Sequence, residues 1–155
     1  MPSATPHDPV LRDPPTPIDP RGPRTNQAVL TAALLGGFLL DWWPVVPVFA
    51  VVLFLGAAFG PRYGPVLRFY AAVVRPRLGP PAHLEDPRPP RFAATVGVIF
   101  LGAATVAFAA GGDAVGWALT LIVAGLAGLA ATTGICVGCE IWLLIARRRH
   151  VELVA

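Results

Sequence analysis

Four long apolar runs constrain this chain more than any other feature of its sequence. They cover residues 26–43, 45–59, 92–110 and 115–146. A helix needs about 20 apolar residues to cross the ~30 Å hydrocarbon core of a bilayer. Only 14% of the residues are charged and the mean hydropathy is +0.64, whereas soluble domains carry about 25% charged residues. The runs therefore predict an all-α integral membrane protein, with a four-helix bundle formed within residues 26–155.

The lengths of the runs predict how they are arranged. The first two runs are short and are separated at Pro44, so we expect a helical hairpin with Asp41, Trp42 and Trp43 at its turn. A continuous helix over 115–146 would be about 47 Å long, which exceeds the hydrocarbon core. That helix must be tilted, project beyond the bilayer or be broken, and a break is best placed at Thr132, Thr133 and Gly134.

Arginine placement predicts the orientation. All twelve basic residues are arginine; they lie in the N-terminal segment, between the second and third runs, and after the fourth. Four spans bring all of them to one side, which the positive-inside rule makes cytoplasmic. The predicted topology is multi-pass in the inner membrane with both termini in the cytosol. The same argument accounts for the basic net charge without a nucleic-acid partner.

Two segments outside the runs have their own predictions. Residues 1–25 are rich in proline and poor in apolar side chains, which predicts a disordered cytoplasmic tail and excludes a signal peptide. Residues 64–78 place apolar side chains at helical spacing, which is typical of an interfacial helix on anionic headgroups; an ordinary basic loop is the alternative. The prolines of 85–92 predict an extended lead into the third span.

Polar groups interrupt the last apolar run in the stretch TTGICVGCE, residues 132–140. Cys136 and Cys139 are the only cysteines of the chain, and Glu140 follows them directly. On one helix these three share a face with Thr132 and Thr133 one turn earlier. An ionisable side chain inside an apolar segment is costly, so we expect Glu140 to face the bundle or a wet cavity and to mark a functional site.

The spacing of the two cysteines is typical of thiol–disulfide chemistry. In C-x-x-C one thiolate attacks a disulfide and the second thiol resolves the mixed intermediate. If a helix restarts near Gly134, its free N–H groups lower the pKa of the attacking thiol. Cys136 is then the nucleophile and Cys139 the resolving thiol, while a neutral Glu140 donates or relays a proton. This chemistry requires no cofactor.

Other interpretations of the same residues stay open. A buried cysteine is often only a small apolar residue, and Glu140 can be a structural partner of Arg91, Arg147 or Arg148. Zinc takes three or four ligands, so a metal site would need a dimer or a large fold-back, and none is predicted. A c-type haem is excluded, because Glu140 stands where that motif requires histidine.

Two motifs give the chain a family resemblance: DPRPPRFA, which begins at Asp86, and TGICVGCE at 133–140. With them the chain resembles a bacterial membrane family known as domain of unknown function 4395, over nearly all its length from about residue 26. The resemblance implies four spans and a site at the motif positions, which are Cys136, Cys139 and Glu140, with Arg88 and Arg91. It also implies a thioredoxin-like or sulfurtransferase partner, because genes for such proteins lie near those of the family.

Three functions follow as hypotheses. The leading one is thiol redox or sulfur handling by a membrane-embedded dithiol with a cytosolic partner, which would make the protein a thiol–disulfide oxidoreductase. The second is a non-catalytic membrane anchor or scaffold with structural cysteines. The third is a transport component for a small sulfur compound or a metal ion, with a path through a homodimer.

Overall fold

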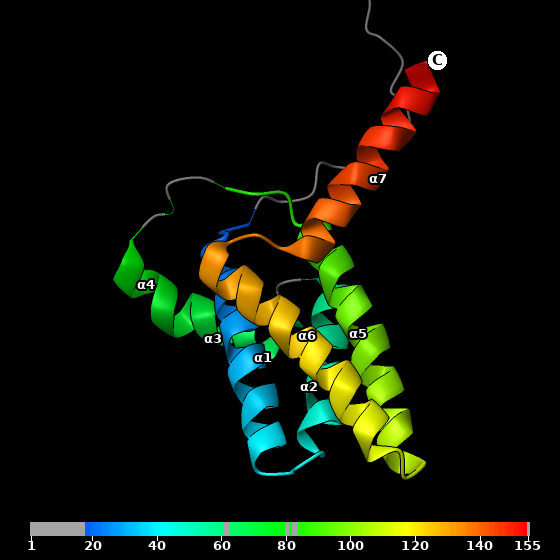
Figure 1. Cartoon of the computed structure of the whole chain (residues 1–155). Helices are drawn as coiled ribbons and strands as arrows, with labels where there is room; N and C mark the ends of the chain where they lie inside the picture. The colour runs from blue at the N-terminus through cyan, green and yellow to red at the C-terminus, as the bar shows by residue number, and fades with distance from the viewer. Residues whose placement is uncertain (1–17, 61–62, 80, 82–83, 155) are drawn as a thin grey trace, which may run out of the picture.

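The computed structural model describes residues 18–60, 63–79, 81 and 84–154, with side chains as far as Arg148. Within these residues every regular element is a helix, and a single isolated bridge joins Ile18 to Glu85 (Figure 1). The predicted all-α class is confirmed. The elements are α1 Arg21–Leu39, α2 Val45–Phe59, α3 Pro65–Phe69, a π-helical turn Tyr70–Val74, α4 Arg75–Leu78, α5 Arg88–Ala109, α6 Asp113–Thr133 and α7 Val137–Val154.

Two helical hairpins form the body of the molecule. The first is α1–α2 and the second α5–α6, and they pack so that α1 lies on α6 while α2 lies on α5 (Figure 1). Leu34, Val46, Leu101 and Thr120 are fully buried between them. The Thr120 hydroxyl donates to the Gly116 carbonyl at 2.8 Å, so this polar group is satisfied within its own helix. Both hairpins begin at the same end of the bundle.

Two of these helices are long and apolar enough to cross a membrane by length and composition, α5 and α6. The helix α2 is apolar but shorter. Large apolar side chains are exposed on the outside of the bundle, which is the arrangement expected of helices whose surroundings are lipid. They include Val48, Val51, Phe54, Ile99, Val106, Val115 and Ile122.

The first helix begins earlier than predicted. It starts at Arg21 instead of Asn26, so the predicted disordered tail is wrong for residues 18–25; residues 1–17 lie outside the described part of the chain. Proline is tolerated at a helix start, because its missing N–H would have no partner there. Pro20 occupies the N-cap position of α1, and Asp19 Oδ1 accepts the backbone N–H of Arg21 at 3.0 Å.

The extended lead predicted before the third span is also wrong in part. The helix α5 already begins at Arg88, with two prolines in its first turn, and Asp86 Oδ1 accepts the N–H of Arg88 at 2.8 Å. The two hairpins thus start with the same local structure and with nearly identical sequences. The matching stretches are DPRGPR at 19–24 and DPRPPR at 86–91.

Of the three arrangements left open for the fourth apolar run, the structure shows the break, at the residues named for it. The helix α6 ends at Thr133, and Gly134 follows in the left-handed conformation with φ 79°. This is the backbone that glycine adopts most easily and that commonly ends a helix. The chain turns, and α7 leaves the bundle in a new direction (Figure 1). The predicted single span 115–146 is therefore two helices.

Of the two alternatives for the middle connection, a helix or an ordinary basic loop, the structure shows the helix. Residues 65–78 are helical throughout, with a π-helical turn before Pro76, whose ring and missing N–H prevent regular α-helical bonding. Tyr70 is buried, and its hydroxyl donates to Asp19 Oδ2 at 2.9 Å. This bond ties the connection to the start of α1.

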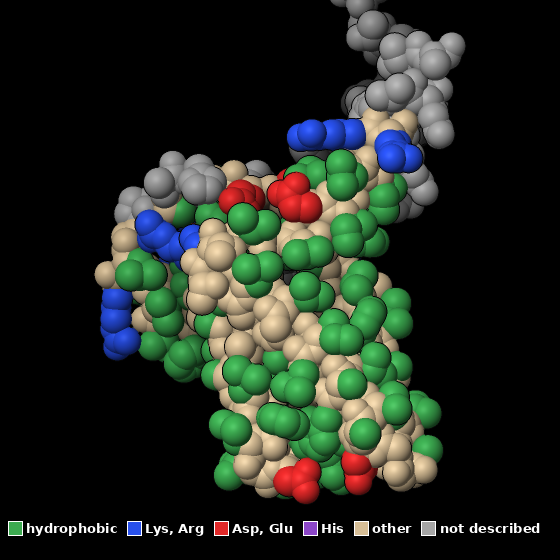
Figure 2. All heavy atoms as spheres, in the orientation of Figure 1, with side chains coloured by type: hydrophobic (Ala, Val, Ile, Leu, Met, Phe, Trp, Pro, Cys, Tyr) green, Lys and Arg blue, Asp and Glu red, His purple; other side chains and the backbone are tan. Residues whose placement is uncertain are grey.

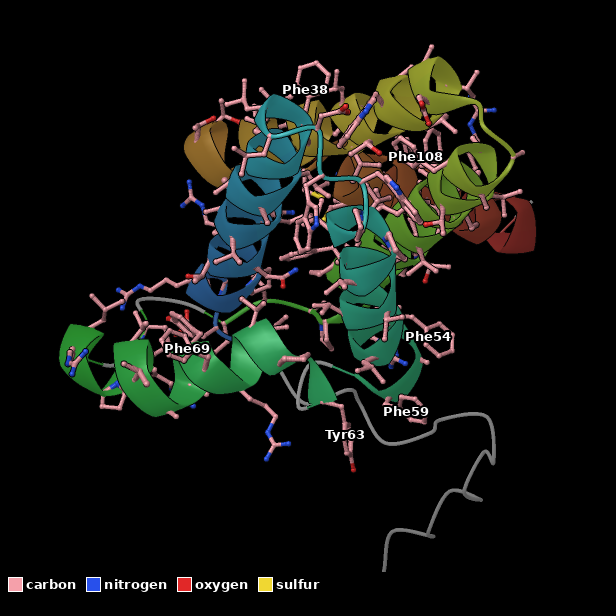
Figure 3. All side chains as sticks on the ribbon, turned by 90° about the horizontal axis from the view of Figure 1, so that it is seen from below. Phe38, Phe54, Phe59, Tyr63, Phe69 and Phe108 are labelled. Carbon is pink, nitrogen blue, oxygen red and sulfur yellow. The ribbon has the colours of Figure 1, made fainter. Side chains whose placement is uncertain are left out.

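Basic and aromatic side chains have distinct positions along the bundle. Basic side chains lie at the end where α1 and α5 begin and on α3–α4, whereas acidic side chains lie at both ends, with Asp41 and Asp113 at the opposite one (Figure 2). Aromatic rings gather at both ends: Phe54, Phe59 and Tyr63 near the basic end, and Phe38 and Phe108 at the other (Figure 3). Trp117 meets Phe108 at 5.0 Å between ring centroids and donates to Asp41 Oδ1 at 3.2 Å.

Candidate functional site

The two cysteines lie where the chain leaves α6 and starts α7. Cys136 directly precedes Val137, the first residue of α7, and its carbonyl accepts the N–H of Glu140 at 2.9 Å. An N-cap residue is defined by this geometry: it is not itself helical, yet its carbonyl accepts the first intrahelical bond. Cys139 is three residues on, in the first turn. Both thiols are free and half-buried.

The sulfur of Cys136 takes the place of a capping oxygen. It accepts from the backbone N–H groups of Gly138 and Cys139 and from the Cys139 thiol. The Nε2 of Gln27, from α1, also donates to it at 3.7 Å. Hydrogen bonds of this kind favour the charged form of an acceptor. The Cys136 sulfur therefore has several hydrogen-bond donors around it, whereas the Cys139 sulfur is described mainly as a donor to Cys136.

Both thiols lie beyond the end of α6. The pKa values of Cys136 and Cys139 follow from the difference in their hydrogen bonds. The Cys139 thiol donates a hydrogen bond to Cys136, and the backbone and Gln27 donate as well. Together these hydrogen bonds lower the pKa of Cys136 to about 6, because their effect is larger than the opposite effect of burial. The same hydrogen bond, then burial and the charge of the Cys136 thiolate, raise the pKa of Cys139 above its ordinary value. The charges of Glu85 and Glu140 act in the same direction on Cys139. Cys136 is thus the thiolate and Cys139 its proton-bearing neighbour.

Glu140 does not lie where the sequence predicts. Its side chain is exposed on α7, because the break at Gly134 resets the helix, and it lines neither of the two cavities near the thiols. Among the side chains that the structure describes, it forms no ion pair with Arg91, Arg147 or Arg148. The expectation that Glu140 faces the bundle is therefore wrong, and its described effect is electrostatic, on Cys139.

Thr132 and Thr133 bond to the backbone at the C-terminal end of α6 and do not form part of a polar stripe. The Thr132 hydroxyl donates to the Gly128 carbonyl at 2.8 Å, and the Thr133 hydroxyl donates to the Leu129 carbonyl at 2.7 Å. The Thr133 oxygen also accepts the N–H of Ile135 at 3.1 Å, which satisfies the linker backbone. The one-face stripe predicted for residues 132–140 is wrong, because these residues belong to two helices and a turn.

The two arginines of the second motif are not at the thiols. Arg88 is exposed, and its described bond is the backbone one to Asp86. Arg91 donates to the carbonyls of Ala57 and Ala58, at 3.0 and 3.3 Å from Nη2, and so closes the C-terminal end of α2. We therefore assign Arg91 a structural contact in the bundle.

A polar cavity of about 230 Å³ opens beside Cys136, and most of its lining was missed by the sequence analysis. Its charged side chains are Arg21 and Arg24 from α1 and Glu85 from the segment before α5. Arg24 lies over the linker, with Nη2 3.0 Å from the position that a Cβ on Gly134 would occupy. The remaining lining residues are Pro20, Pro23, Gln27, Pro81, Gly134 and Cys136.

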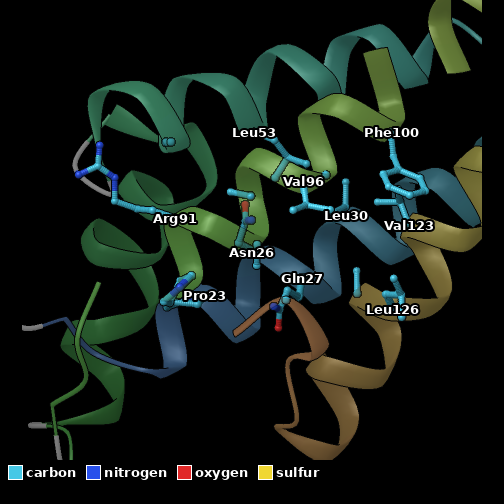
Figure 4. A pocket seen from close by; sticks show the side chains of 18 of the residues that line it. Pro23, Asn26, Gln27, Leu30, Leu53, Arg91, Val96, Phe100, Val123 and Leu126 are labelled. Carbon is cyan, nitrogen blue, oxygen red and sulfur yellow. The ribbon is translucent and has the colours of Figure 1, made fainter. Parts of the chain in front are cut away.

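A second, apolar cavity of about 380 Å³ lies on the other side of Gln27. Leu30, Leu53, Val96, Phe100, Val123 and Leu126 line it, with Asn26, Gln27 and Arg91 as its polar members (Figure 4). Pro23 and Gln27 line both cavities. Gln27 therefore stands between the apolar interior and the thiol site.

Close packing of α7 on α5 fixes the thiols in place. A Cβ on Gly138 would lie 2.7 Å from Ala93 Cβ and 3.0 Å from Ala93 Cα, so only glycine fits without displacing backbone. The glycine between the two cysteines thus lets the first turn of α7 touch α5. This contact sets the position of both sulfurs relative to α1.

One sequence signal could have found the missed arginine. Arg24 is the last residue of the stretch DPRGPR, and Arg91 is the last residue of the matching stretch DPRPPR. Each arginine lies at the C-terminal end of a neighbouring helix: Arg91 of α5 at the end of α2, and Arg24 of α1 at the end of α6. Nothing comparable marks Gln27, which is 109 residues from Cys136. In the described residues no three or more His, Cys, Asp or Glu side chains gather as metal ligands do. His7 and His83 lie outside these residues, and so does the side chain of His150.

Comparisons with known proteins give one match. A family model described as a domain of unknown function (DUF4395) matches residues 18–147. No curated protein and no solved structure matches the chain. The matched range contains both hairpins, the Gly134 break and the thiol pair.

Proposed function

The chain belongs to the family of domain of unknown function 4395, and from its thiol site we propose that it is a membrane-embedded thiol–disulfide exchanger. Its dithiol, Cys136 and Cys139, exchanges electrons with a thioredoxin-like or sulfurtransferase partner in the cytosol. The observation that carries this proposal is the position of the Cys136 sulfur at the start of α7, where Cys139, Gln27 and the helix backbone all donate to it.

The membrane part of the proposal extends from two candidate spans to four. The helices α5 and α6 have the length and composition of spans, and α1 and α2 pack beside them at the same height. Tryptophan and tyrosine are enriched at both membrane–water interfaces, and aromatic side chains lie near both ends of this bundle. These features support four spans, α1, α2, α5 and α6, with α7 outside the hydrocarbon core.

The orientation is proposed from charge. The described arginines gather at the end where α1 and α5 begin, on α3–α4 and on α7, while the two opposite turns contain Asp41 and Asp113 (Figure 2). Under the positive-inside rule the thiol end faces the cytosol of a bacterial cell. Exposed Phe69 and the basic residues of α3–α4 fit a helix at the headgroup level of that leaflet.

The chemistry follows from the assignment of the two thiols. The Cys136 thiolate attacks a disulfide of the partner, and the S–S bond breaks so that one partner sulfur leaves as a thiolate. Cys139 gives its proton to that leaving thiolate and then attacks the Cys136 sulfur. The internal disulfide forms and the partner is released with two thiols, so two electrons pass from the pair to the partner. The reverse sequence reduces the pair.

A trapping experiment tests this function. In cells that express Cys139→Ser, the mixed disulfide between Cys136 and its partner cannot be resolved and should accumulate, and mass spectrometry would identify the attached protein. The matched variant Cys136→Ser should trap nothing. If neither variant forms an adduct, and the double variant supports normal growth under thiol stress, the protein is a scaffold with structural cysteines.

A further inference from the structure

The polar cavity lined by Cys136 also contains the guanidinium of Arg24, which makes no hydrogen bond within the described part of the chain. Arg24 lies over Gly134. Its counterpart in the repeated motif, Arg91, donates to the carbonyls at the end of α2. At the end of α6 the corresponding task is already done by Gly134, whose N–H donates to the Ala130 carbonyl at 3.0 Å, and by the Thr133 hydroxyl.

A second arginine faces the same space. Arg21 lines the cavity with Arg24, and its described side-chain bond is a long one of 3.4 Å from Nη1 to the Leu78 carbonyl. Arg21 and Arg24 therefore line the same cavity as the sulfur of Cys136. Arginine recognises carboxylates because its planar donors match their geometry, and its charge persists at any physiological pH.

One carboxylate opposes the two arginines. Glu85 lines the rim of the cavity and is exposed, and its backbone pairs with Ile18 at 2.9 Å in both directions. The fixed side-chain charges of the lining are thus two positive and one negative, beside a sulfur that is itself anionic near neutral pH. A substrate that brings a negative group would pair with the arginines.

The cavity is too small for a folded protein. Its volume of about 230 Å³ is below the ~300–1,000 Å³ of ordinary ligand pockets. One half of a small disulfide with a carboxylate is of that size. From this geometry we propose that the site also reacts with a small anionic disulfide, whose carboxylate binds Arg21 and Arg24 while its sulfur meets Cys136. This proposal rests on the dithiol exchange proposed above.

The step balances without a further reactant. The Cys136 thiolate attacks the nearer sulfur of the disulfide, and the far half leaves as a thiolate and takes the proton of Cys139. Cys139 then attacks Cys136, and the carboxylate-bearing half leaves as the second thiolate. The substrate disulfide is reduced to two thiols while the protein pair is oxidised to its disulfide; the cytosolic partner restores the dithiol.

A charge series of disulfides tests the proposal. Dithiodipropionate carries two negative charges, hydroxyethyl disulfide carries none, and cystamine carries two positive charges, while all three are unbranched aliphatic disulfides. The rate of Cys136–Cys139 disulfide formation is measured with each, on the purified full chain in detergent. We expect the anion to react at least tenfold faster than the cation at low salt, with a smaller ratio at high salt, as charge-steered encounters do.

Variants separate this inference from the function on which it rests. Arg24→Gln should lower the ratio of the anion rate to the neutral rate about fivefold, Arg24→Lys should retain most of the preference, and Glu85→Gln should increase it. Arg77→Gln, an exposed arginine of α4 outside the cavity, is the matched control. Equal rates for the three disulfides, or an unchanged ratio in Arg24→Gln, would overturn the anionic substrate and leave dithiol exchange standing. Failure of all three to oxidise the pair would overturn both.

Discussion

Cys136 joins a structural and a chemical role in one side chain. As the capping residue of α7 it occupies a position where serine, threonine, aspartate or asparagine is usual, because a side-chain oxygen satisfies the free N–H groups of the first turn. A sulfur there receives the same donors, and a thiolate receives them better than a thiol. Stabilising the helix start and lowering the pKa of the nucleophile are thus the same set of hydrogen bonds.

The pH profile of alkylation is the first prediction. Because the pKa of Cys136 is lowered to about 6, its thiolate forms as the pH rises through 6. The rate of iodoacetamide alkylation at Cys136 should be half-maximal near pH 6 and level above neutrality, while Cys139, whose pKa is raised, stays unmodified there. Peptide mass spectrometry after short pulses measures both. A rate that still rises between pH 8 and 9 would mean an ordinary thiol.

The second prediction concerns Gln27. Replacing it with leucine removes the donor to Cys136 Sγ, so the pKa of Cys136 should rise and the alkylation profile should move to higher pH. Asn26→Leu is the matched control, because Asn26 is adjacent, lines the apolar cavity and has no described bond to the sulfur. The ultraviolet absorbance of the thiolate follows both variants. The same midpoint in Gln27→Leu and Asn26→Leu would remove Gln27 from the site.

At the scale of the helices, the fold depends on the close contact between the first turn of α7 and α5. Gly138 lets α7 touch α5, and Gly138→Ala should destabilise the protein by roughly 1–3 kcal/mol, as overpacking does. The control is Gly125→Ala in α6, where an added Cβ would meet nothing within 4 Å; greater helix propensity should make it neutral or stabilising by up to about 1 kcal/mol. Unfolding in mixed micelles measures both. Equal losses would contradict the proposed contact.

The sequence predicts local features of this protein better than distant ones. The position of the break at Gly134 follows from a few adjacent residues and agrees with the structure, and the lowered pKa of Cys136 is in line with the role expected of it. The prolines near 20 and 89 led to wrong helix starts, because proline interrupts a helix only when it is not in the first turn. Gln27 could not be predicted, since its contact with Cys136 exists only once α1 packs beside α6 and the linker.

At the scale of the whole molecule, the bundle has two unlike ends. One carries the thiols, the arginines and the two repeated motifs, and the other carries the two short turns with Asp41 and Asp113. Such a polarity is what a membrane protein needs in order to insert in one orientation. In the proposed orientation, the thiol pair lies on the cytosolic side, where reducing partners are found.

Sidedness is the prediction that belongs to this scale. In a cysteine-free background, a cysteine at the exposed Asp113 should react with a membrane-impermeant maleimide in intact cells. A cysteine at the exposed Arg147 should react only after permeabilisation. Gel shifts after labelling distinguish the two. Labelling of both from outside, or of neither, would be incompatible with four spans and cytosolic termini.

The most direct measurement of the central claim is a redox titration of the wild-type protein in native membranes. The membranes are equilibrated in thiol–disulfide buffers of stepped potential, quenched with acid, alkylated, and analysed for the peptide that contains Cys136 and Cys139. The dithiol account predicts one reversible two-electron transition from two alkylated thiols to an internal disulfide, and a mixed disulfide on Cys136 alone in Cys139→Ser. Two thiols that stay separately alkylated at every potential would contradict it.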